Sequence, residues 1–214
     1  MKKTIICIDR DGTLIHDSRE HLFLGRDNEW RQKVEILPLA VEGLKLLNTI
    51  DGGGIYMITN QGGVAISDFP LLTEERAHEV CQHVLELLIG KGGLLDGYFL
   101  CPYATPEYVA SRPKVNFHPH MVNERQCLKP SLDMVFDVLK AEGITRDNAD
   151  IYVIGDRASD VQTALNIGGT GILIPFVNEP DEEDKVRKLD QQDDIYIAAN
   201  MVDAAEFILS RIHK

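Results

Sequence analysis

The sequence predicts an α/β fold built on a doubly wound parallel sheet, and three observations support this class. Five short runs are rich in β-branched side chains and apolar on both faces, as strands buried in a parallel sheet are. Segments with helical periodicity separate these runs, which implies right-handed crossovers between parallel strands. Polar residues follow several runs directly, at the carboxyl ends where open parallel sheets bind their ligands.

The predicted strands and helices alternate from the start of the chain. Strands are expected at residues 4–8, 55–58, 98–100, 151–154 and 171–174, and helices at residues 39–48, 73–89 and 131–142. The second helix begins with a Thr-Glu-Glu capping signal, and the third stops at Gly143. A fourth helix is expected after Asp156. The acidic run at residues 179–184 is expected to be a solvated face or loop.

The length of 214 residues suffices for one well-buried core, so a single domain over residues 1–214 is expected. Two stretches, at about 16–36 and 102–127, are polar and longer than ordinary connections, which predicts loop insertions with a functional role. Neither stretch is large enough for a helical cap domain. The site is therefore expected to be fairly open, with substrate choice determined by these two loops.

Charge, hydropathy and cysteine content narrow the expected partners and location. The chain has 22 basic and 34 acidic side chains, a formal charge of −12, so nucleic acid is not an expected partner. An anionic substrate must be held by a local cation or metal, because the overall field repels it. No apolar run approaches the roughly 20 residues of a membrane span, so no membrane partner is expected. A chain without a secretory signal and with four scattered cysteines is expected in the cytoplasm, as a monomer or a small homo-oligomer.

Carboxylates follow two of the predicted strands in a repeated pattern. Asp9 and Asp11 come directly after the first strand, where a single Asp is typical of a turn. Asp156 and Asp160 repeat this arrangement after the strand at 151–154, and four converging carboxylates cannot all stay ionised without a cation. Hard oxygen ligands of this kind suit Mg²⁺, which uses only one or two protein carboxylates and leaves another free as a nucleophile.

Four short motifs resemble those of the haloacid dehalogenase (HAD) superfamily of phosphohydrolases, in the same order and at plausible separations. They are Asp9-Arg10-Asp11-Gly12-Thr13-Leu14, Thr59-Asn60-Gln61, Lys129-Pro130 and Gly155-Asp156-Arg157-Ala158-Ser159-Asp160. Each motif alone is a weak signal, but the ordered set is highly specific. Residues 58–61 and 153–157 resemble the branch of the superfamily that contains histidinol-phosphate phosphatase and heptose bisphosphate phosphatase. The implied fold is a Rossmann-like HAD core.

The resemblance implies catalytic roles for three residues. Asp9 would attack phosphorus and become the aspartyl phosphate. Asp11 would protonate the leaving alcohol and then deprotonate the hydrolytic water. Lys129 would supply positive charge in the transition state. The substrate-binding residues would be Thr59, Asn60 and Arg157.

The resemblance also implies a Mg²⁺ site formed by Asp9, Asp11 through its backbone carbonyl, and Asp156. Asp160 is either a further ligand or a partner that orients Lys129 or a metal-bound water. Structural alternatives exist for several of these residues. Thr59 and Asn60 are also typical of turns, a lone lysine is usually a surface residue, and Asp160 suits the first turn of a helix.

Members of the branch often carry a zinc loop with a Cys-x-His pair and a later Cys-x-Cys pair. Cys101 and Cys127 keep two of these four positions, but Tyr103 and Arg125 occupy the others and are not ordinary zinc ligands. The cysteines are then either buried apolar residues or part of a rebuilt zinc site. That site would consist of Cys101, His118, His120 and Cys127. Leu128 replaces the usual arginine, so a substrate contact at that position is not expected.

The expected function is Mg²⁺-dependent hydrolysis of a small phosphate ester, chiefly a sugar phosphate such as heptose bisphosphate. Histidinol phosphate is the alternative substrate. A phosphatase acting on a nucleic-acid 3′ end is disfavoured by the acidic composition. A catalytically silent HAD-fold binding or scaffold protein is an alternative of another class. The presence of Asp9, Asp11, Lys129 and Asp156 together argues against it.

Overall fold

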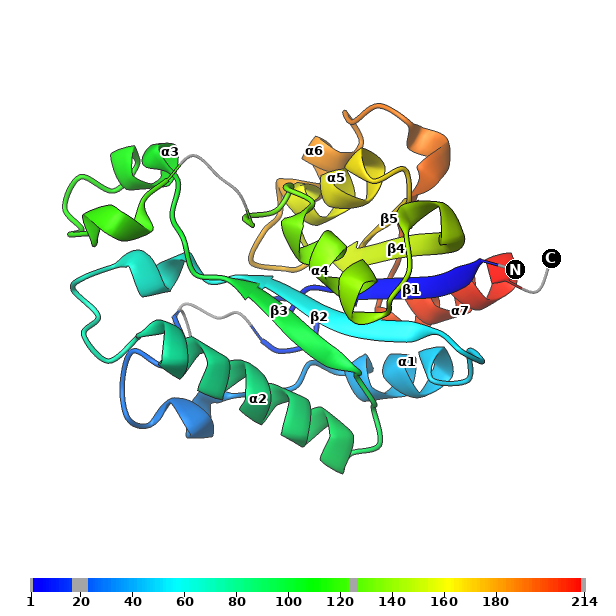
Figure 1. The fold of residues 1–214 in the computed structure, drawn as a ribbon, viewed down its shortest axis with the longest axis horizontal. Coiled ribbons are helices and arrows are strands. Elements are labelled where there is room, and N and C mark those ends of the chain that lie inside the picture. Colours follow the sequence, from blue (N-terminus) through cyan, green and yellow to red (C-terminus); the bar gives the residue numbers. More distant parts are fainter. Residues whose placement is uncertain (1, 17–22, 124–126, 213–214) are drawn as a thin grey trace.

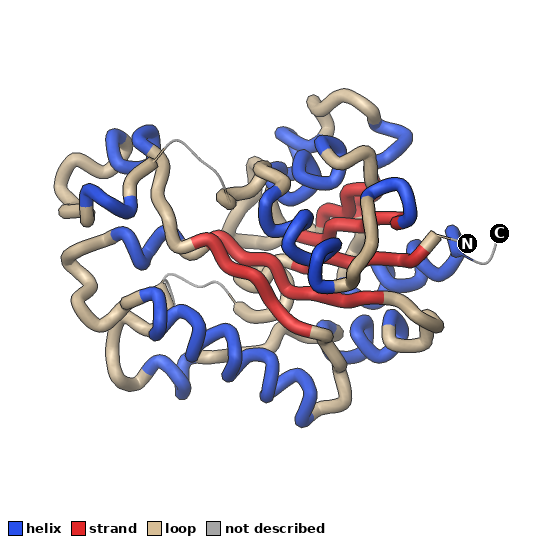
Figure 2. The backbone as a smooth tube through the Cα atoms, viewed as in Figure 1, coloured by secondary structure: helices blue, strands red, loops and turns tan. Residues whose placement is uncertain are grey.

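A computed structural model describes residues 2–16, 23–123 and 127–212. One six-stranded sheet runs through these residues in the order β3-β2-β1-β4-β5-β6, and every pair of neighbouring strands is parallel (Figures 1 and 2). The strands are β1 Lys3–Ile8, β2 Gly54–Asn60, β3 Gly97–Cys101, β4 Ala149–Gly155, β5 Thr170–Leu173 and β6 Ile195–Ile197. The strand order reverses between β1 and β4, and this is where such sheets bind ligands.

Helices cover both faces of the sheet. Figure 1 shows α1, α2 and α7 on one face and α4, α5 and α6 on the other. The α-helices are α1 Ala40–Leu47, α2 Glu74–Gly90, α3 Pro106–Ala110, α4 Asp133–Ala141, α5 Ala158–Asn166, α6 Glu182–Val186 and α7 Met201–Ile212. Strand β1 supplies both layers of the core, because Ile6 and Ile8 pack with the first group while Ile5 and Cys7 pack with the second. Both faces of the sheet are therefore buried.

The predicted doubly wound fold is confirmed, and the five predicted strands and four predicted helices are present within a few residues of the expected bounds. Strand β6 and helices α3, α6 and α7 were not predicted. Strand β6 has three residues, and α3 and α6 have five each, too few for a periodic pattern. Helix α7 does carry a usable stripe, formed by its buried residues Met201, Ala204, Ala205 and Ile208.

The acidic run at residues 179–184 is more structured than expected. It leads into α6, and Glu182 is buried. The carboxylate of Glu182 accepts a hydrogen bond from the backbone N–H of Ala158 at 2.6 Å, at the start of α5. This run therefore caps a helix that carries residues of the site, in addition to presenting charge to solvent.

The two predicted loop insertions differ in structure. In the first, residues 17–22 lie outside the described residues, and Trp30 is fully buried beside His83 of α2, with the two rings edge to face at 5.4 Å. The second contains α3 and lies beyond the carboxyl ends of β2 and β3 (Figure 1). Isolated bridges join Ile66 to Phe117 and Ala104 to Val122, so this loop has a fixed course. Within the described ranges, no helix combines the length and the apolar character needed to cross a bilayer.

Candidate active site

The reversal of strand order brings two aspartates together at the carboxyl edge of the sheet. Strands β1 and β4 are neighbours with Ile8 opposite Ile154, and Asp9 and Asp156 come directly after these strands. The backbone N–H of Asp9 donates to the carbonyl of Ile154 at 2.8 Å, which continues the strand pairing to the nucleophile candidate. The backbone of Asp9 is therefore held beside the strand that leads into Asp156.

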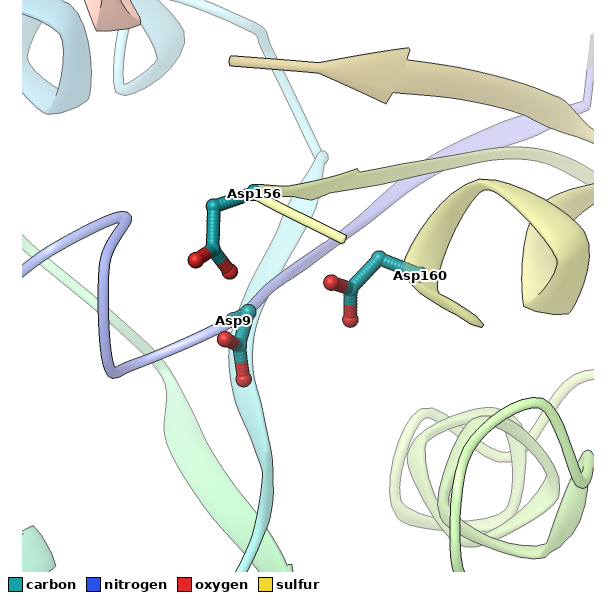
Figure 3. A group of neighbouring side chains, drawn as sticks. All are labelled: Asp9, Asp156 and Asp160. Atoms are coloured by element: carbon teal, nitrogen blue, oxygen red, sulfur yellow. The ribbon is translucent and has the colours of Figure 1, made fainter. Parts of the chain in front are cut away.

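Asp160 joins this pair from the first turn of α5. Ligand oxygens of Asp9, Asp156 and Asp160 all lie within 4.8 Å of one another (Figure 3). All three residues are buried, with 6%, 0% and 1% of their surface exposed. One oxygen of Asp160 also accepts the backbone N–H of Arg157 at 3.1 Å, as expected for a carboxylate in the first turn of a helix.

Lys129 is the cation that contacts this group. Its Nζ donates to Asp9 Oδ1 at 2.6 Å and to the carbonyl of Ile58 at 3.1 Å, and it lies 2.5 Å from Asp160 Oδ1. Burial lowers the pKa of Lys129, but the charges of Asp160 and Asp9 outweigh burial and raise it overall. The lysine is therefore charged, and three buried carboxylates share one ammonium group.

Asp156 carries the unbalanced charge. Neither of its oxygens has a hydrogen-bond partner among the described residues, and Arg157 Nε is 3.9 Å away, beyond hydrogen-bond distance. Burial, followed by the charges of Asp9 and Asp160, raises its pKa to about 9. Burial likewise raises the pKa of Asp9 to about 6, against the opposing effect of Lys129. A divalent cation would satisfy these oxygens, so the site fits a hard metal ion such as Mg²⁺.

Two glycines leave space for these carboxylates. A Cβ on Gly12 would lie 2.2 Å from Asp156 Oδ2, and Gly12 has a positive φ of 81°. A Cβ on Gly155 would lie 2.2 Å from Asp160 Cγ. The glycines of the first and last motifs are therefore required by the close approach of the backbone to the acidic group.

The side chain of Asp11 lies outside the three-carboxylate group. Arg10 binds both of its oxygens, with Nε 3.0 Å from Oδ1 and Nη2 2.8 Å from Oδ2. Gln61 Nε2 donates to the same Oδ2 at 2.8 Å. The side chain of Asp11 is 27% exposed and lines the pocket, while Arg10 and Gln61 hold its carboxylate in position.

No function was predicted for Arg10 or Gln61. Arg10 is 1% exposed and also donates to Gln61 Oε1 at 2.7 Å and to Cys81 Sγ at 3.4 Å. Gln61 in turn donates to Thr59 Oγ1 at 2.7 Å. A charged residue between two strand-end aspartates was the available signal, because arginine is almost never fully buried unless it is paired.

The predicted phosphate-binding residues have partners within the protein. Asn60 Oδ1 accepts the backbone N–H of Lys129 at 2.9 Å, and its Nδ2 lies 3.4 Å from the carbonyl of the same residue. Thr59 is 1% exposed. Arg157 has a half-exposed side chain that binds Glu179 at 2.8 Å. Asn60 thus holds the lysine loop against the end of β2, and a phosphate contact by Thr59, Asn60 or Arg157 stays a prediction.

An open pocket of about 560 Å³ lies over the acidic group. Its walls include residues of the four motifs, among them Asp9, Asp11, Asn60, Lys129, Asp160 and Arg157. The loop at residues 102–127 supplies further walls, including Tyr103, Thr105, Tyr108 and Arg112. This volume is in the range of small-molecule sites, about 300–1,000 Å³.

The structure contradicts the rebuilt zinc site. Cys101 and Cys127 form a disulfide, so neither sulfur is the thiolate that zinc requires. His118 and His120 lie with their ring centroids 5.6 Å apart on the exposed part of the loop. Over the described ranges, the cluster of Asp9, Asp156 and Asp160 is the only group of three or more His, Cys, Asp or Glu residues close enough to share a metal ion. The rebuilt zinc site, one of the two alternatives for these cysteines, is therefore not supported.

Comparisons with known proteins agree with this fold and site. The HAD-hydrolase-like family model matches residues 126–202. The histidine biosynthesis bifunctional protein HisB of Campylobacter jejuni subsp. jejuni is 31% identical over 172 residues, which cover 80% of this chain and 42% of that protein. HisB of Blochmanniella floridana is 30% identical, with coverage of 80% and 41%. The chain thus spans about two fifths of the length of these relatives.

Solved structures show the same fold. D,D-heptose 1,7-bisphosphate phosphatase from B. bronchiseptica, complexed with magnesium and phosphate, superposes with a TM-score of 0.72 at 21% identity and covers 99% of both chains. A putative HAD-like phosphatase from Mesorhizobium loti gives a TM-score of 0.63 at 22% identity, covering 81% of this chain and 73% of that one.

The fold and the acidic site at the strand-order reversal define a HAD-like α/β hydrolase. The predicted resemblance to the HAD superfamily is therefore confirmed. The predicted resemblance to the branch with histidinol-phosphate and heptose bisphosphate phosphatases is confirmed.

The contact between Gly12 and Asp156 predicts the effect of a methyl group. Gly12→Ala is expected to lower the rate of p-nitrophenyl phosphate hydrolysis at least about a hundredfold, because the added Cβ would displace the Asp156 carboxylate. Gly143→Ala is the matched control, since Gly143 also has a positive φ (64°) but nothing within 4 Å of the added Cβ. The control is expected to lose about 1–2 kcal/mol of stability and keep its activity. Equal activity losses in the two variants would contradict a specific role for the Gly12 contact.

The raised pKa of Asp156 predicts how the stability of the metal-free protein depends on pH. Between the ordinary pKa of about 4 and the folded-state pKa of about 9, the folded state holds a proton that the unfolded state has lost. Raising the pH therefore favours unfolding, by up to about 1.4 kcal/mol per pH unit. Urea unfolding in EDTA from pH 5 to 8 is expected to show a decline in wild-type stability that Asp156→Asn reduces. The exposed Asp137→Asn is the control, and three parallel profiles would contradict this account of the charge imbalance.

The disulfide predicts the thiol and zinc content. Protein purified without reductant is expected to show two reactive thiols in denaturant, from Cys7 and Cys81, and four after reduction. Metal analysis of the same sample is expected to find no stoichiometric zinc. Four thiols without reduction, together with one zinc ion per chain, would support the rejected zinc site instead.

Proposed function

We propose that the chain is a Mg²⁺-dependent phosphomonoester hydrolase that acts on a small phosphorylated metabolite through an aspartyl phosphate on Asp9. The observation that carries this proposal is the buried group of Asp9, Asp156 and Asp160, in which three carboxylates share one lysine. Such a group serves poorly as a structural element, because buried charges destabilise a fold unless they are paired. It is well suited to holding a metal ion beside a nucleophile.

Asp9 and Asp156, with the backbone carbonyl of Asp11, are the candidate metal ligands. Bound Mg²⁺ would supply positive charge that offsets the charge of the carboxylates and of the substrate phosphoryl group. The superposed heptose bisphosphate phosphatase was solved with magnesium and phosphate, which supports this choice of ion. Asp160 is the candidate for positioning Lys129, because its Oδ1 lies 2.5 Å from Nζ.

Asp9 is the candidate nucleophile. Lys129 binds its Oδ1, so Oδ2 is the candidate for attack on phosphorus. As the new O–P bond forms, the bond from phosphorus to the ester oxygen breaks, and the alcohol leaves with a proton from Asp11. Asp11 then takes a proton from water, whose oxygen bonds to phosphorus. Cleavage of the bond to Asp9 releases inorganic phosphate and restores the Asp9 carboxylate, while Asp11 again holds a proton in place of the one that it gave to the alcohol.

The hydrogen bonds to Asp11 support its separate role. Arg10 and Gln61 bind the carboxylate, and these contacts hold the side chain apart from the three-carboxylate group. Asp11 still lines the pocket, where the leaving alcohol of a substrate would lie. The two aspartates of the first motif are thus held for different tasks by different partners, Lys129 for Asp9 and Arg10 for Asp11.

The proposed substrate is a sugar phosphate such as a heptose bisphosphate, with histidinol phosphate as the second candidate. The fold match to heptose bisphosphate phosphatase supports the first, and the HisB relatives support the second. A silent binding protein is disfavoured by the complete set of Asp9, Asp11, Lys129 and Asp156. A cytoplasmic location and a monomer or small homo-oligomer stay predictions.

Asp11→Asn provides the sharpest test of the mechanism. p-Nitrophenolate leaves without protonation, so the variant is expected to form the phosphoenzyme readily and hydrolyse it slowly. With Mg²⁺, rapid-quench measurement is expected to show a burst approaching one equivalent of p-nitrophenol per site, followed by slow turnover. Asp9→Asn is expected to lose several orders of magnitude in kcat and to show no burst.

Two controls define this experiment. Asp137→Asn changes an exposed aspartate on α4 and is expected to behave as wild type, and EDTA-treated wild type is expected to be inactive. Absence of both a burst and a trapped phosphoenzyme in Asp11→Asn would remove the acid/base assignment. Substantial activity in folded Asp9→Asn would remove the nucleophile assignment. Absence of turnover in wild type with Mg²⁺ would favour the silent binding protein.

A further inference from the structure

The outer wall of the pocket carries a stacked pair formed by Tyr108 and Arg112. The guanidinium carbon of Arg112 lies 3.7 Å from the centroid of the Tyr108 ring. Arg112 Nη1 donates to Ser111 Oγ at 2.8 Å, which further fixes the guanidinium. Both residues of the pair line the same pocket as Asp9. The contact therefore presents a positioned cation to the space above the catalytic group.

Two further contacts hold Tyr108 in position. Its backbone N–H donates to Thr105 Oγ1 at 3.1 Å at the start of α3. Its ring meets Phe117 edge to face, with centroids 6.0 Å apart and an interplanar angle of 84°. Phe117 is in turn bridged to Ile66, which directly follows the 3-10 turn at Gly62–Ala65. The position of the stacked arginine is thus supported by contacts within the loop and with the segment after β2.

Arg112 differs from the other cations of the pocket in its ion pairs. Arg10 is paired with Asp11, Lys129 with Asp9 and Asp160, and Arg157 with Glu179. Arg112 has no carboxylate within 4.0 Å among the residues that the structure describes. A guanidinium group has five N–H donors in a planar fork that matches a phosphate or carboxylate. Hence Arg112 retains the capacity to bind an anion.

Arg157 adds charge near the same position. The charges of Arg112 and Arg157 both act to lower the pKa of the Tyr108 hydroxyl, against the larger effect of burial, so both cations lie near this ring. The pair of Arg157 with Glu179 is partly exposed, with 44% and 34% of the side-chain surfaces accessible. Exposed ion pairs contribute only about 0–1 kcal/mol, so a ligand anion can compete with Glu179.

We infer that Arg112 and Tyr108 form a subsite for a second anionic group of the substrate, and that the substrate is a phosphate ester carrying a further phosphate or carboxylate. This inference rests on the proposed phosphatase function. The pocket of about 560 Å³ is large enough for a small metabolite with two anionic groups. Because the chain has a formal charge of −12, recognition of a doubly anionic substrate requires such a local cation.

Paired substrates and variants test the subsite in turnover. The substrates are fructose 1,6-bisphosphate with fructose 6-phosphate, 6-phosphogluconate with glucose 6-phosphate, and p-nitrophenyl phosphate. Arg112→Ala is expected to reduce kcat/KM about 10- to 100-fold for one doubly anionic ester or both, mainly through KM, and less than about threefold for p-nitrophenyl phosphate. Arg112→Lys keeps the positive charge but loses the planar fork of N–H donors. Its kcat/KM for the doubly anionic esters is expected to lie between those of wild type and Arg112→Ala. Lys114→Ala removes another exposed cation of this loop, outside the pocket walls. This control is expected to leave kcat/KM unchanged for doubly anionic and for singly phosphorylated substrates.

The pattern among substrates identifies the anion. Dependence on Arg112 with fructose 1,6-bisphosphate alone assigns a phosphate, and dependence with 6-phosphogluconate alone assigns a carboxylate. Equal losses for all five substrates would indicate a structural role and overturn the inference. The inference would also be overturned if Arg112→Ala reduced kcat/KM for the doubly anionic esters no more than Lys114→Ala does.

Binding separates failure of the subsite from failure of the phosphatase proposal. Calorimetric titration of Asp9→Asn protein with fructose 1,6-bisphosphate and with 6-phosphogluconate, each against its singly phosphorylated partner, needs no turnover. At least one doubly anionic compound is expected to bind more tightly than its singly phosphorylated partner, and adding Arg112→Ala is expected to remove this difference. Such a result would support the subsite even in a protein without activity. No preference for either compound over its partner would overturn the subsite, while a burst in Asp11→Asn would leave the phosphatase proposal intact.

Discussion

Three buried carboxylates share one lysine, and this charge imbalance is the constraint on which the rest of the site depends. Lys129 is within ion-pair distance of Asp9 and Asp160, but Asp156 is fully buried with no hydrogen-bond partner among the described residues. The anionic form of Asp156 is therefore costly until a further cation is present, as its pKa of about 9 reflects. The fold tolerates this cost where the strand order reverses, because packing and backbone hydrogen bonds on both faces hold the strands in place.

The backbone fixes the charged groups more firmly than side-chain packing alone could. Asp9 continues the pairing of β1 with β4, Asp160 accepts the N–H of Arg157 in the first turn of α5, and Asn60 binds the main chain of Lys129. Each contact joins segments that are distant in the sequence or secures the start of a helix. The glycine at position 12 then admits the Asp156 carboxylate. Preorganisation of this kind positions reacting groups before a substrate arrives.

The pocket divides into an inner and an outer part with different electrostatics. Each of the inner cations Arg10 and Lys129 is paired with a carboxylate, and Asp156 adds a negative charge that a bound metal ion would offset. In the outer part, Arg112 is stacked on Tyr108 and lacks a carboxylate partner among the described residues. The disulfide between Cys101 and Cys127 closes the base of the loop that carries this pair. The proposed chemistry thus lies at the sheet edge, and the proposed choice of substrate lies on the loop.

The sequence by itself determined the doubly wound fold and three members of the acidic group, although it also placed the Asp11 carboxylate in that group. Buried parallel strands and amphipathic helices leave local patterns, and Asp9, Asp156 and Asp160 had to converge once the strands were parallel. Gln61, which helps to set the direction of the Asp11 side chain, lies 50 residues from Asp11 along the chain. Asn60, which binds the main chain of Lys129, lies 69 residues from that lysine. Tertiary structure also decided the disulfide in place of a zinc site and the place of Arg112 in the pocket. Local pattern records which face of an element is buried, whereas the partner of a polar side chain is decided by which elements pack together.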